Sequence, residues 1–158
     1  MSDAVQLLKE QHAEVKALFK QIERVTDPVL RAQIFRTIDT NLRIHATVEE
    51  KIFYPAFREH AKNRSQSEEV GEALHEHDIV KGVLQEIERT DPSSESFKTK
   101  LASLKMLVEQ HVHEEEHGML KEARRLFRAD ELEDLALRME HAGMQASPAY
   151  EMAGPSMR

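Results

Sequence analysis

The chain contains no cysteine among its 158 residues. This absence excludes disulfides, thiolate metal sites, iron–sulfur clusters and cysteine nucleophiles, and it leaves nitrogen and oxygen as the strong side-chain ligands. Basic residues are also few, with 22 Lys and Arg against 29 Asp and Glu. The net charge of −7 argues against a general nucleic-acid binder, which needs a basic face.

Glycine, proline and aromatic residues are scarce: the chain has five Gly, five Pro and 5% aromatic side chains. Together with 32% charged residues, this balance favours helices over a sheet. No apolar run approaches the roughly 18–20 residues of a membrane span, and residues 1–4 lack the features of a signal peptide. We therefore expect a cytoplasmic protein with no membrane partner.

Four long segments repeat apolar residues at the helical period, within residues 5–22, 34–56, 70–87 and 101–115. Each stripe is the face that a helix buries in a bundle. A shorter helix is expected from Asp130 to Gly143. The sequence thus predicts an all-α fold, an up-down-up-down four-helix bundle with a short fifth C-terminal helix over residues 1–143, followed by a flexible tail over 144–158.

The two halves of the chain resemble each other. The segment from His12 to Arg24 matches the segment from His77 to Arg89 at an offset of 65, and both copies run into Thr-Asp-Pro. A second pair of segments, 45–50 and 111–116, matches at an offset of 66. Two helical hairpins related by an approximate two-fold axis would place matching residues around one centre.

Six polar residues lie near the middle of the four otherwise apolar stripes. They are His12, His45, Glu49, His77, His111 and Glu115. Within each His-x-x-x-Glu pair the two side chains differ by about 40° around the helix, so they point the same way. Four imidazoles and two carboxylates therefore converge in an apolar interior, where unpaired polar groups cost several kcal/mol.

Two interpretations of this convergence were weighed. A single histidine on an apolar stripe is more often a satisfied core residue than a ligand. The joint occurrence on four helices, duplicated across the repeat, instead favours a pair of metal ions, because imidazole and carboxylate ligands suit iron, manganese or zinc.

At these residues the sequence resembles the hemerythrin-like (HHE cation-binding) family, over roughly residues 4–142. The motifs that carry the resemblance are Glu10-Gln11-His12, His45-x-x-x-Glu49-Glu50 with Ile52-Phe53-Tyr54-Pro55-Ala56, Glu76-His77, and His111-Val112-x-Glu114-Glu115-Glu116. The resemblance implies two iron ions in a non-haem di-iron centre, oxo- or hydroxo-bridged. It further implies that the four histidines bind iron and that Glu49 and Glu115 bridge the irons.

The chain departs from the oxygen-carrying hemerythrins in two places. They have two histidines four apart on the third helix, where this chain has Ala73 and Lys81 around His77. They also have an aspartate at the position of Glu116. If both carboxylates bridge, the six side chains fill about eight of the roughly twelve positions of two octahedral irons. The remaining positions are open to solvent or a small ligand, which favours redox chemistry over simple oxygen carriage.

Other candidate residues receive weaker interpretations. Tyr54 lies about 180° from His45 on an ideal helix, so packing or a contact with the ligand residues is favoured over ligation, although Pro55 could distort that geometry. The zinc-protease pattern His113-Glu114-x-x-His117 and the ferritin-like Glu72-x-x-His75 and Glu114-x-x-His117 fall away from the apolar stripes. His60 and His141 are expected at the surface.

The sequence-based hypothesis is a protein that binds, senses or reacts with O2, peroxide or NO at the buried His/Glu site. One alternative is a di-iron enzyme that decomposes hydrogen peroxide, for which no dedicated acid–base pair can be named. Another is a metal-dependent, iron-sensing interaction module. Whether the protein is an enzyme is left open, a small-molecule ligand is the expected partner, and no protein partner can be named.

Overall fold

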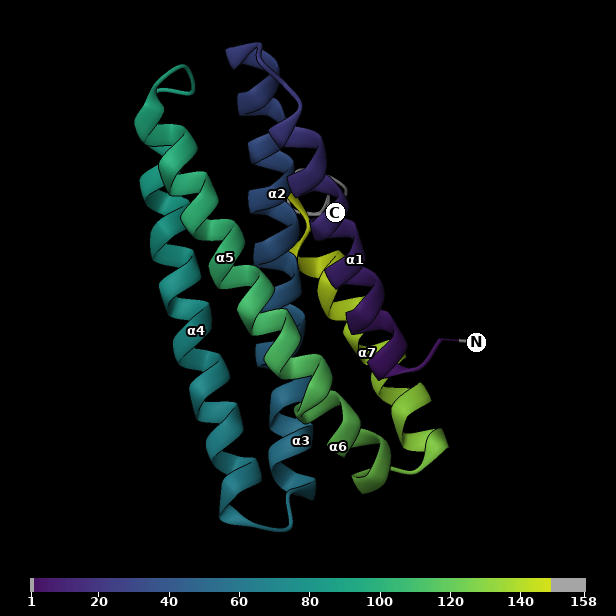
Figure 1. Cartoon of the computed structure of the whole chain (residues 1–158). Helices are drawn as coiled ribbons and strands as arrows, with labels where there is room; N and C mark the ends of the chain where they lie inside the picture. The colour runs from purple at the N-terminus through teal and green to yellow at the C-terminus, as the bar shows by residue number, and fades with distance from the viewer. Residues whose placement is uncertain (1, 149–158) are drawn as a thin grey trace.

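A computed structural model describes residues 2–148, and within that range the chain is helical apart from short connections. The first helix of the bundle is α1 (Ala4–Glu23). The second is α2 (Pro28–Val48), which continues through a π-helical turn, η1 (Glu49–Phe53), into α3 (Tyr54–His60). The third and fourth are α4 (Arg64–Glu88) and α5 (Glu95–His117). Figure 1 shows these four rods side by side in alternating directions, which confirms the predicted up-down-up-down bundle.

Local sequence signals set where the helices begin. The Asp3 carboxylate accepts a hydrogen bond from the Gln6 amide at 2.9 Å and caps α1. Asp27 accepts from the Val29 amide at 3.1 Å, and Pro28 takes the first helical position, where its missing N–H costs nothing. The related Thr-Asp-Pro at 90–92 forms a turn instead, and α5 begins after Ser94.

Two further helices follow the fourth helix of the bundle in the sequence. The short helix α6 (Met119–Leu126) leads to α7 (Ala129–Ala146), which packs beside α1 and α2 (Figure 1). Because α7 buries Leu132, Leu135 and Met139, its apolar face extends the core. The helix runs three residues past the predicted end at Gly143. Most of the predicted tail, residues 149–158, lies outside the described residues, so the division into bundle and tail stays a prediction.

The core divides into two apolar clusters with a polar layer between them. One cluster, called the lower cluster here, lies at the end of the bundle that holds α3 and α6. It contains residues from the start of α1, from α3, and from α6 and α7, among them Leu8, Phe57, Leu120 and Met139. The upper cluster gathers the other ends of the bundle helices; among its members are Phe19, Ile38, Leu84 and Leu104. On each bundle helix a histidine falls between the two clusters, so the fold isolates a layer of imidazoles from bulk water. No helix in residues 2–148 has the length and apolar character to cross a membrane.

Candidate metal centre

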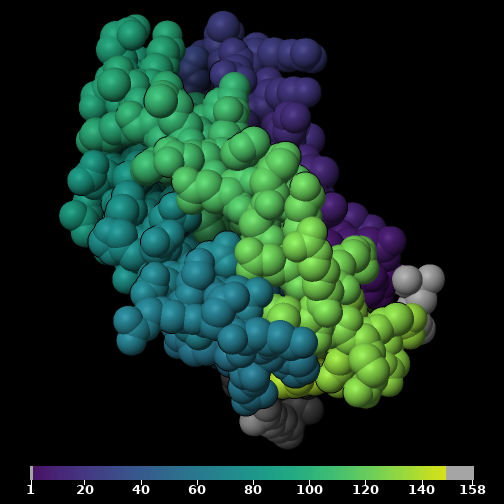
Figure 2. Space-filling model, turned by 60° about the horizontal axis from the view of Figure 1, so that its bottom comes forward, coloured from purple at the N-terminus to yellow at the C-terminus, as the bar shows by residue number. Residues whose placement is uncertain are grey.

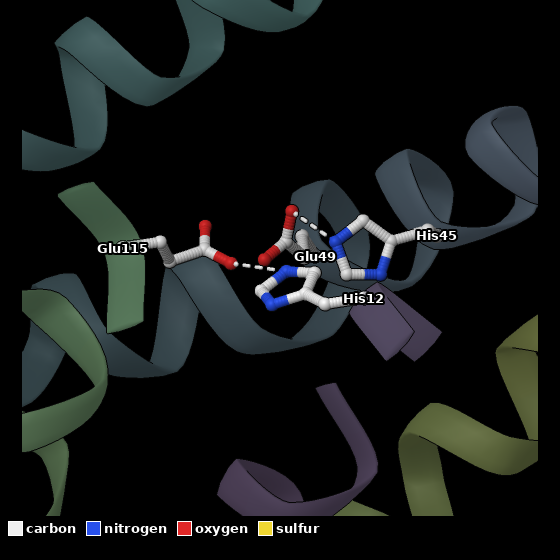
Figure 3. Close-up of side chains that lie close together, drawn as sticks. All are labelled: His12, His45, Glu49 and Glu115. Atoms are coloured by element: carbon white, nitrogen blue, oxygen red, sulfur yellow. Dashed lines mark ion pairs between the residues drawn. The ribbon is translucent and has the colours of Figure 1, made fainter. Parts of the chain in front are cut away.

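The structure brings all six predicted residues together in this layer. They come from four helical segments: His12 from α1, His45 and Glu49 from the α2–η1 rod, His77 from α4, and His111 and Glu115 from α5. Each is at most 8% exposed. Figure 3 shows four of them, with the ring nitrogens and carboxylate oxygens pointing toward one another. The packing of the two matched hairpins therefore produces the convergence that the repeat predicted.

The donor atoms form two groups that share a carboxylate. One group contains His12, His45, Glu49 and Glu115, and the other contains Glu49, His77 and His111. Glu49 Oε1 lies 3.1 Å from His45 Nε2, 3.0 Å from His77 Nε2 and 3.9 Å from His111 Nε2. A single carboxylate oxygen thus meets imidazoles from three helices.

Glu115 joins the two groups from the opposite side. Its Oε1 lies 3.2 Å from His12 Nε2, and its Oε2 lies 3.3 Å from His111 Nε2. Each of the two carboxylates therefore has contacts in both halves of the chain, as bridging ligands require.

In each of the four histidines of the centre, the outer ring nitrogen, Nδ1, also has a hydrogen-bond partner. His12 Nδ1 donates to Glu116 at 2.8 Å, and His77 Nδ1 donates to Glu50 at 2.7 Å. The other two pairs are His45 Nδ1 with the Gln11 side-chain oxygen and His111 Nδ1 with Glu76, both at 2.6 Å. With Nδ1 holding the proton, each Nε2 presents its lone pair to the centre, which is the tautomer that a metal ligand needs.

These four outer partners were not singled out as site residues from the sequence. The signal for them was present, however, because each lies next to one of the six inner residues in the chain. Gln11 and Glu76 precede His12 and His77, and Glu50 and Glu116 follow Glu49 and Glu115. Each partner also occupies a matching position in the two halves of the repeat.

Tyr54 contacts residues of the centre, which is one of the two roles that the sequence favoured over ligation. Its hydroxyl donates to Glu115 Oε2 at 2.6 Å and lies 3.0 Å from Glu49 Oε1 and 3.2 Å from His77 Nε2. The cause is the π-helical turn, in which the Tyr54 amide donates to the Glu49 carbonyl five residues back. One extra residue in a turn shifts the following side chains by roughly 100°, so Tyr54 moves from about 180° to about 80° from His45. Pro55 has no N–H for the usual bond four residues back, which favours this distortion.

The polar atoms of the layer fit a metal better than they fit one another. His12 Nε2, His45 Nε2, His111 Nε2, Glu49 Oε2 and Glu115 Oε1 are buried and have no hydrogen bond of acceptable geometry. Their contacts fall within ion-pair distance, yet the atoms point at a common centre rather than along hydrogen-bond directions. Since buried native polar groups are nearly always satisfied, this set of nitrogen and oxygen donors matches the needs of a cation such as iron, manganese or zinc.

The pKa values of the layer also indicate that its carboxylates need a positive counter-charge. Burial lowers the pKa of His111, but the close contacts and negative charge of Glu115 and Glu49 outweigh it and raise the pKa to about 12. Burial raises the pKa of Glu49, but the charge of His45 and hydrogen bonds outweigh it and hold the pKa well below its usual range. Burial and the two carboxylates raise the pKa of Tyr54 well above its usual value. Without a metal the layer therefore holds protons on imidazoles as the counter-charge to its carboxylates.

The other histidine motifs do not join the centre. His113 and His117 lie on the exposed face of α5, where their rings contact each other at 4.1 Å between centroids. His75 and His141 are exposed, as predicted. His60 corrects the prediction of a surface residue, because it is half-buried, bonds Glu131 at 3.1 Å and stacks on Phe127.

Comparison with known proteins connects this geometry to a family. The family model described as the hemerythrin HHE cation binding domain matches residues 3–123. A crystal structure of a hemerythrin HHE cation binding domain-containing protein from Mycobacterium kansasii, a homologue of Rv2633c, superposes with a TM-score of 0.83 at 26% identity and covers 97% of this chain and 92% of that one. A curated protein from Nostoc sp. (strain PCC 7120 / SAG 25.82 / UTEX 2576), named DNA nickase, is 26% identical over 137 residues, or 86% of this chain and 38% of that protein. The chain therefore spans less than half the length of this relative.

Proposed function

This chain belongs to the hemerythrin HHE cation-binding family, and from that premise we propose that it holds two iron ions in the His/Glu centre and there binds, senses or reacts with O2, peroxide or NO. The observation that carries the proposal is the pair of donor groups that share Glu49, each with two buried imidazoles. Two groups with one shared carboxylate suit two ions held side by side. Bound iron would supply the electrons and the open coordination positions that oxygen species need.

A small apolar cavity supports a neutral diatomic or peroxide ligand. It has a volume of about 40 Å³ and reaches all four histidines. Its other lining residues are mainly aliphatic, including Val15, Leu42, Leu84 and Val108. Gln11, Arg43 and Lys81 also belong to the lining, but aliphatic side chains make up most of the rest. A cavity this small and this apolar favours a small molecule with little charge.

The chain's own residues would define the reactive position. The four Nδ1–H donors fix the rings so that Nε2 is the only ring atom facing the ions. Tyr54 holds a proton between Glu115 and Glu49, at an oxygen 3.2 Å from His77 Nε2. A phenol at that point can donate a hydrogen bond to a ligand, or become a ligand itself if a bound metal ion displaces its proton.

The test of the proposal is metal analysis combined with optical spectra of the iron-loaded protein before and after exposure to O2, peroxide and NO. We expect about two irons per chain and ferric absorption that changes on reduction. Catalytic peroxide consumption that is lost in His45→Ala and Glu115→Ala but retained in His113→Ala would select the peroxide-decomposing enzyme. The proposal would be refuted if protein offered iron and zinc retained stoichiometric zinc and showed no ferric absorption.

Tyr54 provides a second and independent prediction. If its oxygen binds ferric iron, the loaded protein shows a visible phenolate-to-iron band, and Tyr54→Phe loses the band while keeping its iron. Tyr150→Phe is the matched control, because Tyr150 is the other tyrosine of the chain. A band that survives in Tyr54→Phe would assign the phenol to hydrogen bonding alone.

The absence of a nucleic-acid partner and a cytoplasmic location stay predictions. The net charge of −7 supports the first. The match covers only 38% of the relative named DNA nickase, so the activity of that protein is not carried over to this chain.

A further inference from the structure

Two larger cavities touch residues of the centre, and their linings differ in charge. One has a volume of about 540 Å³, touches His12 and is lined by four lysines, Lys9, Lys16, Lys20 and Lys105. The other has a volume of about 340 Å³, touches His111 and Glu115, and has no lysine or arginine in its lining. The second, called the acidic cleft here, lies between α4 and the α5–α6 segment, which Figure 2 shows side by side in teal and green.

Carboxylates line the acidic cleft from its mouth to its floor. These residues are Glu69, Glu72, Glu76, Glu114 and Glu115. Glu72 and Glu114 are exposed, Glu69 and Glu76 are half-buried, and Glu115 is 4% exposed. The cleft therefore offers negative charge at every depth, which concentrates cations and accelerates their association.

The floor of the cleft is formed by His111 and Glu115. His111 and Glu115 are each more than nine-tenths buried, and His111 Nε2 and Glu115 Oε1 have no hydrogen-bond partner. Both residues belong to the proposed metal centre. Within the cleft Glu76 contacts His111 Nδ1 at 2.6 Å, and the unpartnered His111 Nε2 faces Glu115 and Glu49 in the centre. An ion that moved down the cleft would therefore meet Glu76 before it reached the unpartnered atoms, whereas the lysines of the other large cavity would repel it.

A second feature lies beside the mouth. Glu69 Oε2 and Glu122 Oε2 are both buried without a hydrogen-bond partner. Burial and the neighbouring Glu122 and Glu72 carboxyl groups raise the pKa of Glu69 to about 7. Gly118 keeps this side open, because a Cβ there would lie 2.9 Å from Glu69 Oε1 and from the Glu114 carbonyl oxygen. Two neighbouring carboxyl groups that disfavour each other's charge gain from a cation that neutralises both.

We propose that divalent metal cations reach the buried centre through the acidic cleft, where Glu72 and Glu69 capture them at the mouth. The proposal rests on the metal centre of the preceding section and adds the route by which that centre is filled. It assigns Glu72 a role in the rate of loading and none in the loaded centre, since Glu72 contacts none of the six inner residues or their four partners in the described hydrogen bonds.

The experiment compares Glu72→Lys with Glu14→Lys, which makes the same charge change at an exposed position on α1. Metal-free protein is mixed with Fe²⁺ without oxygen, and a strong chelator added at intervals stops the uptake. We expect Glu72→Lys to load about tenfold more slowly than wild type at low ionic strength, and Glu14→Lys less than twofold more slowly. High salt should shrink the difference, because it screens exposed charges. The final iron content should match wild type.

Each other outcome overturns a defined part of the argument. Equal slowing in both variants would assign the effect to net charge, and unchanged loading in Glu72→Lys would place the route elsewhere. A lower final iron content in Glu72→Lys would make Glu72 part of the loaded centre. Failure of the wild type to retain two ions would instead refute the proposed function. Glu69→Gln provides a second test, with slower loading and unchanged content expected.

Discussion

Glu49→Ala is expected to lose both of the proposed metal ions, because both donor groups depend on this one carboxylate. Glu49 Oε1 lies within 3.1 Å of imidazole nitrogens from two helices and 3.0 Å from the Tyr54 hydroxyl. The side chain is fully buried, so no solvent molecule or surface group can replace it without opening the bundle. Removal of a hydrogen-bond partner of a metal ligand typically costs about 10–100-fold in metal affinity, so removal of a ligand itself should cost at least as much, and here the loss applies to both ions.

The measurement is iron per chain after loading and desalting, with far-ultraviolet circular dichroism to verify the fold. Wild type should retain about two ions, and Glu49→Ala close to none. Glu49→Gln keeps the volume of the side chain and removes its charge, so it separates loss of ligation from loss of packing. His113→Ala is the control, since His113 is exposed and outside the centre.

Variants of single histidines should divide the centre into its two groups. His12 belongs only to the group with His45, and His77 belongs only to the group with His111. His12→Ala and His77→Ala should therefore each retain about one ion. Retention of two ions in Glu49→Ala would contradict the shared-carboxylate geometry.

Most of the bundle and of the centre could be predicted from the sequence because both obey ordinary helix periodicity. A histidine and a glutamate four residues apart share a helix face, and the matched halves of the chain bring such faces together. This reasoning places His45 with Glu49 and His111 with Glu115, as the structure has them. It depends only on angles within straight helices and on the pairing of apolar stripes.

Tyr54 could not be placed in the same way, because its position depends on a break in that periodicity. The π-helical turn moves it by roughly 100° relative to an ideal helix, and sequence does not fix whether a helix absorbs a proline by kinking or by a π-turn. The end of α7 is similar. The predicted end was assigned to Gly143, yet α7 continues because residues around that glycine pack on α2, where a Cβ at Gly143 would lie 3.3 Å from Val48.

The outer partners of the histidines show a further limit. Each is one residue from an inner residue in sequence and therefore about 100° away on the helix, so periodicity alone assigns it to the boundary between core and surface. Only the packing of a neighbouring helix decides whether such a side chain reaches an imidazole. Glu76 on α4 reaches His111 on α5, and Gln11 on α1 reaches His45 on α2. These contacts follow from helix pairing, which the sequence predicted only in outline.

Removal of the metal is expected to destabilise the protein, and the loss should grow as the pH rises above about 6.5. In the metal-free protein the raised pKa values of His12, His77 and His111 mean that the folded chain keeps protons on these imidazoles. In each case burial opposes protonation, and hydrogen bonds and charge from the nearby carboxylates outweigh it.

The sign of the pH effect follows from proton binding. Below pH 6.5 the folded and unfolded chains both hold these protons, so the stabilisation from the His–Glu contacts is fully present. Above it the unfolded chain releases its protons while the folded chain retains them, and the free energy of unfolding falls by about 1.4 kcal/mol per pH unit for each such imidazole until the folded pKa is reached. Glu49, whose pKa is lowered, stays ionised in this range and adds no pH dependence.

The metal-bound protein should not show this loss, because an imidazole that binds a metal through Nε2 holds no proton there. Metal binding displaces the protons instead, so the affinity for the metal rises with pH while the metal-free protein weakens. Calorimetric melting of metal-free and iron-loaded protein at pH 6.5, 7.5 and 8.5 should therefore give a Tm difference that widens with pH. The variant His113→Ala/His117→Ala, which alters only exposed histidines, should show the same widening. A Tm difference that is constant or narrows over this range would mean that the buried imidazoles are neutral without metal, and the carboxylates of the layer would then need another counter-charge.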